Sequence, residues 1–489
     1  MRSSVHSADD ASPAKPSAAL GTQVSSRSLT IALIVACAFF MENLDATIIV
    51  TAIPPIAHSF ATTATRMSLA ITAYVLATAA CIPASGWIAD RVGARNLFAA
   101  AIGVFTLASL TCGAAPTFLA FIGARVVQGA AAAMMSPVGR LVVLRTTEKR
   151  DLMGALSTLV WPALFAPVIG PPLGGFITTS LSWRWIFYVN VPLGVAGVCL
   201  VLAFIPNQKA AQRTAFDARG FVLMAVALAC LTYGLDAVGS RDIHLALAAG
   251  LMLTAAAVGY LAVRHLRSAA APLVRLATLR VHTFVVGCVS GGNVSRAAIS
   301  ATPFLLPLMF EVGFGLSPAA AGLLLLVYMA ANLAMKAITN PILKRYGMRA
   351  VLIVNCTIAS LGIAACALIS PAVPWVVSGL ILVLAGASRS MQLTSITYVT
   401  FADIEPEDRS DASVISSLAQ QISMGMGVSL GALMLNFSRA ARHAPSLGLA
   451  DFRIAFVAAG ALCALSILSY RRLATNAGAE ISGHRAAAH

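Results

Sequence analysis

The chain has 489 residues, of which 59% are hydrophobic and only 10% are charged, and its mean hydropathy is +0.86. Soluble domains carry about a quarter charged residues, so this composition excludes a water-soluble globular protein. The net charge of +15 is spread between apolar runs and is not clustered on one solvated face, which argues against nucleic-acid binding.

Apolar runs of about 20 residues, long enough to cross a bilayer as helices, recur along the chain. They follow a Ser-, Ala- and Pro-rich segment, residues 1–28, that we expect to be a disordered cytoplasmic tail. The first run is too long for a signal-peptide core, so we expect an uncleaved helix. The pattern predicts about 14 membrane helices. They lie at 29–52, 67–89, 96–115, 118–143, 152–179, 185–205, 217–238, 243–263, 281–311, 318–343, 348–370, 373–402, 411–436 and 452–471.

Basic residues between the runs predict the orientation. An even number of helices places both termini on one side, and the positive-inside rule makes that side the cytoplasm. The basic groups then inside include Arg91, Arg95, Arg145, Lys149, Arg150, Lys209, Arg213, Arg219, Arg264, Arg267, Arg275, Arg280, Lys344, Arg345, Arg349, Arg409, Arg471 and Arg472. One loop, with Arg439, Arg442 and Arg453, is a local exception. We expect a multi-pass protein of a bacterial inner membrane with cytoplasmic termini.

Two motifs occur twice, which indicates an internal repeat. GWIADRVGARNL at 86–97 resembles NPILKRYGMRAV at 340–351, and EKRDLMGALSTL at 148–159 resembles EDRSDASVISSL at 407–418. The offsets are 254 and 259 residues, whereas six helices with short loops take about 200. The remaining residues, about 50, suffice for one inserted helical hairpin.

The repeat predicts the domain organisation. A tail precedes two homologous six-helix bundles, a helical hairpin is inserted between them, and a second cytoplasmic tail follows. The predicted parts are 1–28, 29–206 (first bundle), 216–264 (hairpin), 280–472 (second bundle) and 473–489.

The motif GxxADRxG after the second helix resembles the loop signature of the major facilitator superfamily. The hairpin resembles that of its 14-helix drug:proton antiporter group, the QacA/EmrB-like exporters. Four further segments match in order: ENLDATIIVTAIP (42–54), ARVVQGAAAA (124–133), PVIGPPLGG (167–175) and SWRWIFYVNVPLG (182–194). The resemblance implies an all-α major facilitator fold and a proton-coupled antiporter that exports drugs or other small lipophilic compounds by alternating access. The second signature departs from the pattern, with Asn340 for the leading Gly and Lys344 for the acid.

Three residues are predicted to couple transport to protons. Asp45 in helix one and Arg125 in helix four both fall in the outer half of the bilayer, where ionisable groups are costly and usually paired. Separation of the pair would let Asp45 take up a proton, and a permanent structural salt bridge is the alternative. Glu42 shares a helix face with Asp45, so it either interacts with that carboxylate or lines a polar cavity wall.

Two glycine-containing motifs are predicted to serve the conformational cycle. The resemblance implies that Asp90 meets the N-terminal end of helix thirteen in one state only, as a latch; a tight solvated turn is the alternative. The latch residues are Gly86, Asp90, Arg91 and Gly93. In helix five, Gly and Pro residues allow bending and close packing. The resemblance implies that this antiporter motif, Gly170, Pro171, Gly174 and Gly175, seals the interface between the bundles.

The second half carries polar groups that the resemblance places at the central cavity. They are Asn293, Arg296, Asn332, Arg389 and Gln392. Lys336 lies near a helix end and could instead extend to the inner surface. Because basic groups outnumber acidic ones in these helices, an organic anion such as a carboxylate is the alternative substrate.

The sequence does not favour an enzyme. It contains no HExxH, GxSxG or P-loop motif, and its nine cysteines lie in apolar runs without a CxxC pair. We expect no cofactor, metal site or nucleic-acid partner, and we expect a small-molecule substrate, protons and the lipid bilayer as partners. The sequence does not decide whether a separate periplasmic adaptor protein docks.

Overall fold

A computed structural model describes residues 26–146, 152–207, 216–238, 245–269, 272, 274–405, 408–475 and 477–478. Every regular element in these residues is a helix. Eleven helices are long and apolar enough to cross a membrane, and α6, α9 and the broken helix α11–α12 occupy three further positions. This arrangement agrees with the 14 helices predicted. Most of the two predicted tails lies outside the described residues.

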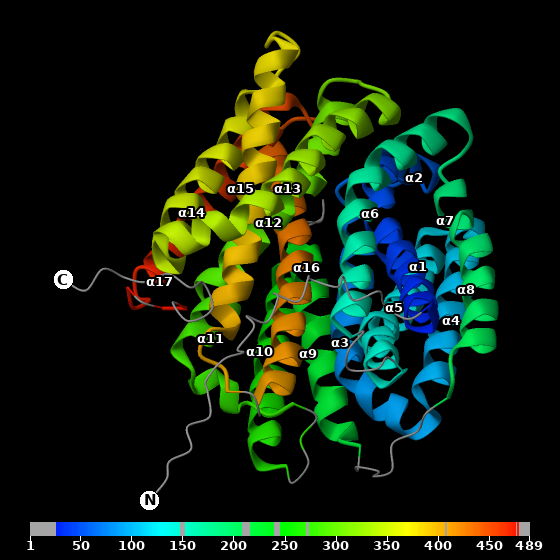
Figure 1. Ribbon diagram of the computed structural model, residues 1–489. Coiled ribbons are helices and arrows are strands. Elements are labelled where there is room, and N and C mark those ends of the chain that lie inside the picture. Colours follow the sequence, from blue (N-terminus) through cyan, green and yellow to red (C-terminus); the bar gives the residue numbers. More distant parts are fainter. Residues whose placement is uncertain are drawn as a thin grey trace, which may run out of the picture.

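The elements fall into two groups and a hairpin (Figure 1). The first group comprises α1 (Ser26–Ile48), η1 (Ile49–Ala52), α2 (Ile53–Ser59), α3 (Ser68–Val92), α4 (Ala94–Ala114), α5 (Phe118–Thr146), α6 (Leu152–Ser180), α7 (Trp185–Tyr188) and α8 (Asn190–Phe204). The hairpin is α9 (Ala218–Val238) and α10 (Leu245–Ser268). The second group comprises η2 (Ala277–Arg280), α11 (His282–Cys288), α12 (Gly291–Leu308), η3 (Met309–Gly313), α13 (Pro318–Tyr346), α14 (Met348–Ala365), η4 (Cys366–Leu368), α15 (Trp375–Phe401), α16 (Arg409–Ala441) and α17 (Leu449–Tyr470).

The two groups repeat the same packing. In the first, α1 packs on α6 and α8, and α5 packs on α3 and α4. In the second, α12 packs on α16 and α17, and α15 packs on α13 and α14. Each helix of the first group therefore has a counterpart with equivalent neighbours in the second, as two copies of one unit would give.

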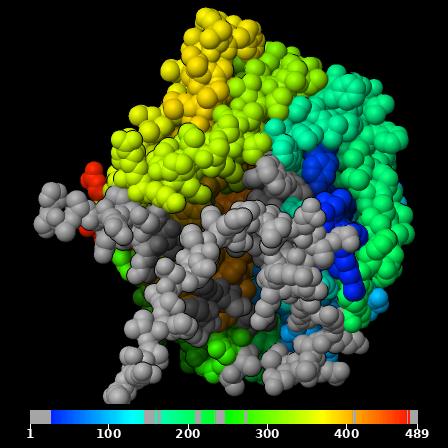
Figure 2. Space-filling view, in the orientation of Figure 1, coloured from blue at the N-terminus to red at the C-terminus, as the bar shows by residue number. Residues whose placement is uncertain are grey.

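The groups meet along two seams, α3 with α16 and α6 with α13, and the space-filling view shows them touching across the upper part of the molecule (Figure 2). The hairpin helix α9 packs on both α3 and α16. Its Met224 and Leu228 pack against Ala79 of α3 and Leu418 of α16. The hairpin therefore covers the α3/α16 seam.

Two glycines make equivalent sharp turns. Gly93 joins α3 to α4 with φ of 100°, and Gly347 joins α13 to α14 with φ of 77°. A side chain is strained at such positive φ values, which explains why glycine is kept in both copies of the loop signature. The arginines near the turns are Arg91, Arg95, Arg345 and Arg349. We call the face of the molecule that carries these turns the basic face, and the other the opposite face.

Two membrane helices differ from the predicted segments. The first continues beyond residue 52 through the tight turn η1 into α2, whose first turn holds Pro54, where a missing N–H is tolerated. The ninth, predicted to be continuous over 281–311, breaks between α11 and α12. Gly291 and Gly292 follow the break, and glycine lowers the stability of a helix interior.

Candidate functional site

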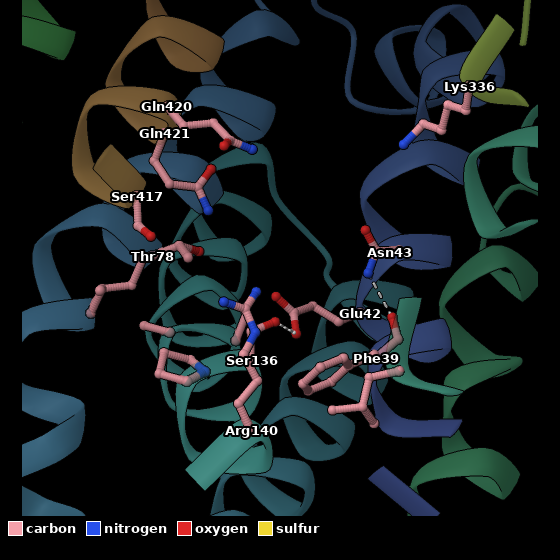
Figure 3. Close-up of a pocket in the computed structure, with 15 residues that line it drawn as sticks. Phe39, Glu42, Asn43, Thr78, Ser136, Arg140, Lys336, Ser417, Gln420 and Gln421 are labelled. Carbon is pink, nitrogen blue, oxygen red and sulfur yellow. Dashed lines mark hydrogen bonds between the residues drawn. The ribbon is translucent and has the colours of Figure 1, made fainter. Parts of the chain in front are cut away.

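A polar cavity of about 580 Å³ lies between the two helix groups (Figure 3). Six helices contribute to it: α1, α3, α5 and α6 from the first group, and α13 and α16 from the second. The lining residues are Phe39, Glu42, Asn43, Thr78, Ile82, Ala132, Ala133, Ser136, Pro137, Arg140, Leu159, Lys336, Ser417, Gln420 and Gln421. Because both groups form its walls, their relative motion would change its shape.

The cavity lies toward the basic face. Its residues on α3 lie near the middle of that helix, and those on α5 and α13 lie at the middle or in the second half of each helix, toward that face. Its residues on α16 come from the first half of that helix, which begins at the same face. Toward the opposite face both seams are closed. Thr72 of α3 lies 3.3 Å from Ser429 of α16, and the backbone N–H of Ala319 donates to Thr179 Oγ1 at 3.2 Å. The structure is therefore closed at the opposite face.

Glu42 is the one carboxylate among the cavity-lining residues that the structure describes. It accepts a hydrogen bond of 2.8 Å from the hydroxyl of Ser136 on α5, and the positively charged Arg140 lies nearby on the same helix (Figure 3). Of the two roles that the sequence allows, this position matches that of a cavity wall. Ser136 and Arg140 were missed in the sequence because neither belongs to a motif.

Lys336 enters the cavity from the other group. It extends from α13 and points into the space between the two groups, apart from the Glu42 side chain (Figure 3). The sequence offered snorkelling to the inner surface as its role. The structure instead places it in the cavity wall.

Asp45 and Arg125 form a fully buried ion pair inside the first group. Arg125 Nη1 donates to Asp45 Oδ2 at 2.7 Å, and the exposed fractions of the two side chains are 1% and 0%. The other carboxylate oxygen accepts bonds from Gln128 at 2.9 Å and from Asn190 at 2.8 Å. The Arg125 guanidinium also lies over the ring of Tyr74, at 4.3 Å from its centroid. The carboxylate oxygens of Asp45 thus receive three charge-assisted hydrogen bonds, and the face of the Tyr74 ring stabilises the guanidinium.

Several members of this network were not predicted. Gln128 lies three residues after Arg125, on the same face of α5, and it also donates to Ser109 at 2.6 Å. Asn190 lies in the aromatic segment that opens the sixth membrane helix, and its amide nitrogen lies 3.1 Å from the same hydroxyl. The helical spacing of Gln128 could have revealed its role. Ser109 and Asn190 could not be placed, because they come from other helices.

The pair does not line the cavity, although it lies close to it along the chain. Asp45 follows Glu42 by one helical turn, yet Glu42 is partly exposed and Asp45 is fully buried. One helix thus presents one carboxylate to the cavity and the next to the interior of the first group.

The latch residues lie at the end of α3, beside the hairpin. Gly93 is so close to Asn207 that an added Cβ would meet its side-chain oxygen at 2.1 Å. The Arg91 guanidinium lies 5.2 Å from the ring centroid of Trp87, and that ring lies 4.6 Å from the ring of Phe216, just before α9. Gly86 has no neighbouring atom within 4 Å of an added Cβ, and Asp90 is half-buried. The motif is therefore in contact with the inserted hairpin.

The predicted antiporter motif of the fifth membrane helix, α6, packs on two other helices, α1 and α13. Gly170 and Gly174 pack on α1, where added Cβ atoms would meet Thr47 Oγ1 at 2.3 Å and the Ile48 carbonyl at 2.4 Å. Gly175 packs on α13 across the seam, where a Cβ would meet the Pro318 carbonyl at 2.3 Å. Pro171 contributes its carbonyl oxygen, which lies 2.5 Å from a Cβ added at Gly322. These contacts, made without side chains, let α6 approach both α1 and α13 closely.

The second-half candidates do not come together. Arg296 is buried within the second group and donates to the carbonyl of Gly287 at 3.4 Å, and Asn293 accepts a bond from Ser423. Gln392 accepts a bond of 2.8 Å from Asn355, between α15 and α14. None of these three lines the cavity. Periodicity could not reveal this, because it does not fix which way a helix faces in a bundle.

Two candidates lie nearer to Lys336. Asn332 is half-buried on α13, one turn before Lys336 and on the same helix face. Arg389 is half-buried on α15, and its Nη1 lies 3.4 Å from the hydroxyl of Tyr328. The structure thus leaves Lys336 as the one second-half base that lines the cavity among the described residues.

Within the described parts of the chain, no three His, Cys, Asp or Glu side chains gather closely enough to hold a metal ion. Two pseudo-equivalent helix groups around a polar cavity that is closed at one face define a membrane transporter of the alternating-access type. The model of the Major Facilitator Superfamily matches residues 35–428 and 288–486. The chain belongs to the major facilitator superfamily.

Curated relatives support this membership. The chain is 37% identical over 406 residues to "Putative multidrug resistance protein MdtD" of Klebsiella pneumoniae (strain 342), which covers 82% of this chain and 85% of the relative. The Citrobacter koseri protein of the same name is 36% identical over 408 residues, with the same coverage.

Solved structures show the same fold. A D-xylose-proton symporter superposes with a TM-score of 0.66 at 14% identity, covering 93% of this chain and 99% of the symporter. The human organic anion transporter MFSD10 superposes with a TM-score of 0.57 at 13% identity, covering 91% and 99%. At such low identity these likenesses concern the fold alone.

Proposed function

We propose that the protein is a proton-driven antiporter that exports drug-like or other small lipophilic compounds. The observation that carries this proposal is the cavity, which both helix groups line and which is closed toward the opposite face. Relatives that are 36–37% identical over the aligned residues are named for multidrug resistance. An organic anion as the general substrate, the alternative left by the sequence, is not favoured by those names.

The proposal includes an orientation. The positive-inside rule places the basic face, with Arg91 and Arg345, in the cytoplasm of a bacterium. The cavity would then open toward the cytoplasm, and the structure would represent the inward-facing state. Closure at the basic face would involve α3 and α16, where Asp90 would act as the latch.

Proton coupling would use the two carboxylates of α1 in sequence. Glu42 is in the cavity, so a proton and a positively charged or polar group of the substrate can compete for it. Asp45 is paired with Arg125, and movement of α1 against α5 would separate the pair and let the carboxylate take up a proton. Alternating access would thereby exchange substrate for protons.

A periplasmic adaptor protein is a further partner that we propose. It would dock at the opposite face, where the loop before α17 carries Arg442, paired with Asp451. Affinity purification from intact envelopes would show an adaptor by its co-elution, and purification of the transporter alone would argue against it.

The test is transport in proteoliposomes with an imposed pH gradient. Uptake of lipophilic compounds should follow the gradient and should stop on addition of a protonophore. Asp45→Asn should bind substrate but should not accumulate it against a gradient. Transport that ignores the gradient in the unaltered protein would rule out proton-driven export.

A further inference from the structure

The two helix groups contain a shared motif that the loop signatures do not include. Arg125 and Gln128 of α5 form the pattern Arg-x-x-Gln, and Arg389 and Gln392 of α15 repeat it. Both helices occupy the fourth position of their group and pack on equivalent neighbours. The motif thus places one arginine at a corresponding level of each half.

The two arginines differ in how their charges are balanced. Arg125 has the carboxylate of Asp45 at 2.7 Å. Among the described residues, the partner of Arg389 is the phenol of Tyr328, whose oxygen lies 3.4 Å away and whose ring centroid lies 5.9 Å away. The buried Nε of Arg389 has no hydrogen-bond partner within the described residues. The second copy of the motif therefore lacks its counter-ion.

Lys336 adds a second positive charge on α13, the helix that packs on α15. It lies close enough to Arg389 for the two charges to repel, and no carboxylate in the described chain forms an ion pair with either of them. Glu42, the acid of the cavity, is bonded to Ser136 and lies near Arg140. The second-group wall of the cavity consequently carries uncompensated positive charge.

We infer that Lys336, with Arg389 behind it, binds an anionic group of the exported compound, namely a carboxylate, sulfonate or phosphate. Uncompensated charge within a membrane protein is costly, and an anion from the substrate would remove that cost while it is bound. An ammonium forms short charge-assisted hydrogen bonds with such oxygens. This inference rests on the proposed function and narrows its substrate class.

The rest of the cavity indicates what else the compound carries. Apolar side chains, among them Phe39, Ile82 and Leu159, share the wall with neutral polar groups such as Gln420 and Gln421. An amphipathic acid fits this lining, with its anionic end at Lys336 and its apolar body between the helices. In a zwitterion, the cationic end would reach Glu42.

A matched pair of compounds tests the inference. An aromatic sulfonate and the corresponding neutral sulfonamide have nearly the same shape, and the sulfonate stays charged, so it does not cross the bilayer unaided. In proteoliposomes with a pH gradient, the unaltered protein should transport the sulfonate with a KM lower by about tenfold or more. Lys336→Gln should remove this preference, and Lys336→Arg should retain most of it.

Arg296→Gln provides the control, because it removes a buried base of the same group that already has the Gly287 carbonyl as a partner. It should leave the preference for the sulfonate unchanged. Equal loss of both compounds in Lys336→Gln, or preference of the unaltered protein for the sulfonamide, would overturn the inference. If neutral lipophilic compounds follow the gradient and the sulfonate does not, the inference fails and the proposed function stands. If nothing follows the gradient, the proposed function fails.

Discussion

The two copies of the Arg-x-x-Gln motif have opposite electrostatic settings. On α5, Arg125 is surrounded by a carboxylate, an amide and an aromatic ring, all supplied by the first group. On α15, the hydrogen-bond partner of Arg389 among the described residues is the phenol of Tyr328, and Lys336 is a positively charged neighbour. The duplicated helical unit thus contains one arginine with a counter-ion and one whose charge no described carboxylate balances.

This difference suggests that the two halves have different roles, one in proton coupling and the other in substrate recognition. A buried ion pair with every carboxylate bond satisfied responds to protons only when its helices move, so it suits coupling. An exposed cation at a cavity wall responds directly to what enters the cavity, so it suits recognition. The first half would then govern energy coupling, and the second half would govern the choice of substrate.

The largest expected effect follows removal of the arginine that has a counter-ion. Arg125→Gln leaves Asp45 buried without its counter-ion, and such a change costs about 3–5 kcal/mol of folding free energy. The apparent melting temperature in detergent should fall steeply. Addition of Asp45→Asn to this variant should recover part of the loss, because the unpaired charge is then removed. Failure to recover would show that the pair does not act as a unit.

A smaller effect is expected where the first group meets the second. Gly175→Ala places a Cβ at 2.3 Å from the Pro318 carbonyl across the α6/α13 seam, so the helices must move apart. Overpacking of this kind destabilises the closed seam by about 1–3 kcal/mol. The substitution should therefore favour the state that opens toward the opposite face. Cysteine accessibility at that face should increase. Gly123→Ala, where an added Cβ meets nothing within 4 Å, should change neither stability nor accessibility.

The smallest effect on stability is expected for the other arginine of the repeated motif. Arg389→Gln removes a charge that no described carboxylate balances, so folding stability should change by less than about 1 kcal/mol or should increase. The measurement is the apparent melting temperature of Arg389→Gln compared with that of Arg125→Gln. A loss for Arg389→Gln as large as for Arg125→Gln would show that the second site has a structural counter-ion, and the contrast between the halves would be wrong.

Much of the fold could be predicted from the sequence. The membrane helices are defined by the length of each apolar run, and the repeated loop signature revealed that the chain is duplicated. The pairing of Asp45 with Arg125 followed from their similar depth and from the cost of leaving either charge alone in the bilayer. The coupling role of that pair, the latch role of Asp90 and the domain boundaries stay predictions.

Other features of the site depended on contacts between distant segments. The sequence could not decide whether Glu42 interacts with Asp45 or lines a cavity wall. The helical period places the two carboxylates on one face of α1, but it does not show which side of that helix meets the cavity. Arg296 and Arg389 were both predicted to lie at the central cavity. In the structure, the partner of Arg296 is the backbone carbonyl of Gly287, and the partner of Arg389 is the phenol of Tyr328. Lys336 looked like a helix-end lysine.

The sequence by itself determined that the protein lies in a lipid bilayer, how many helices it has, that one helix group is repeated and that a hairpin is inserted. These follow from properties that act locally, namely the length of an apolar run, the residues of a turn and the spacing of repeated motifs. Only the tertiary structure decided which carboxylate of α1 is in the cavity, which bases have partners and where the seams are closed. The rotation of each helix about its axis settles these points, and that rotation is fixed by packing against helices far away in the chain.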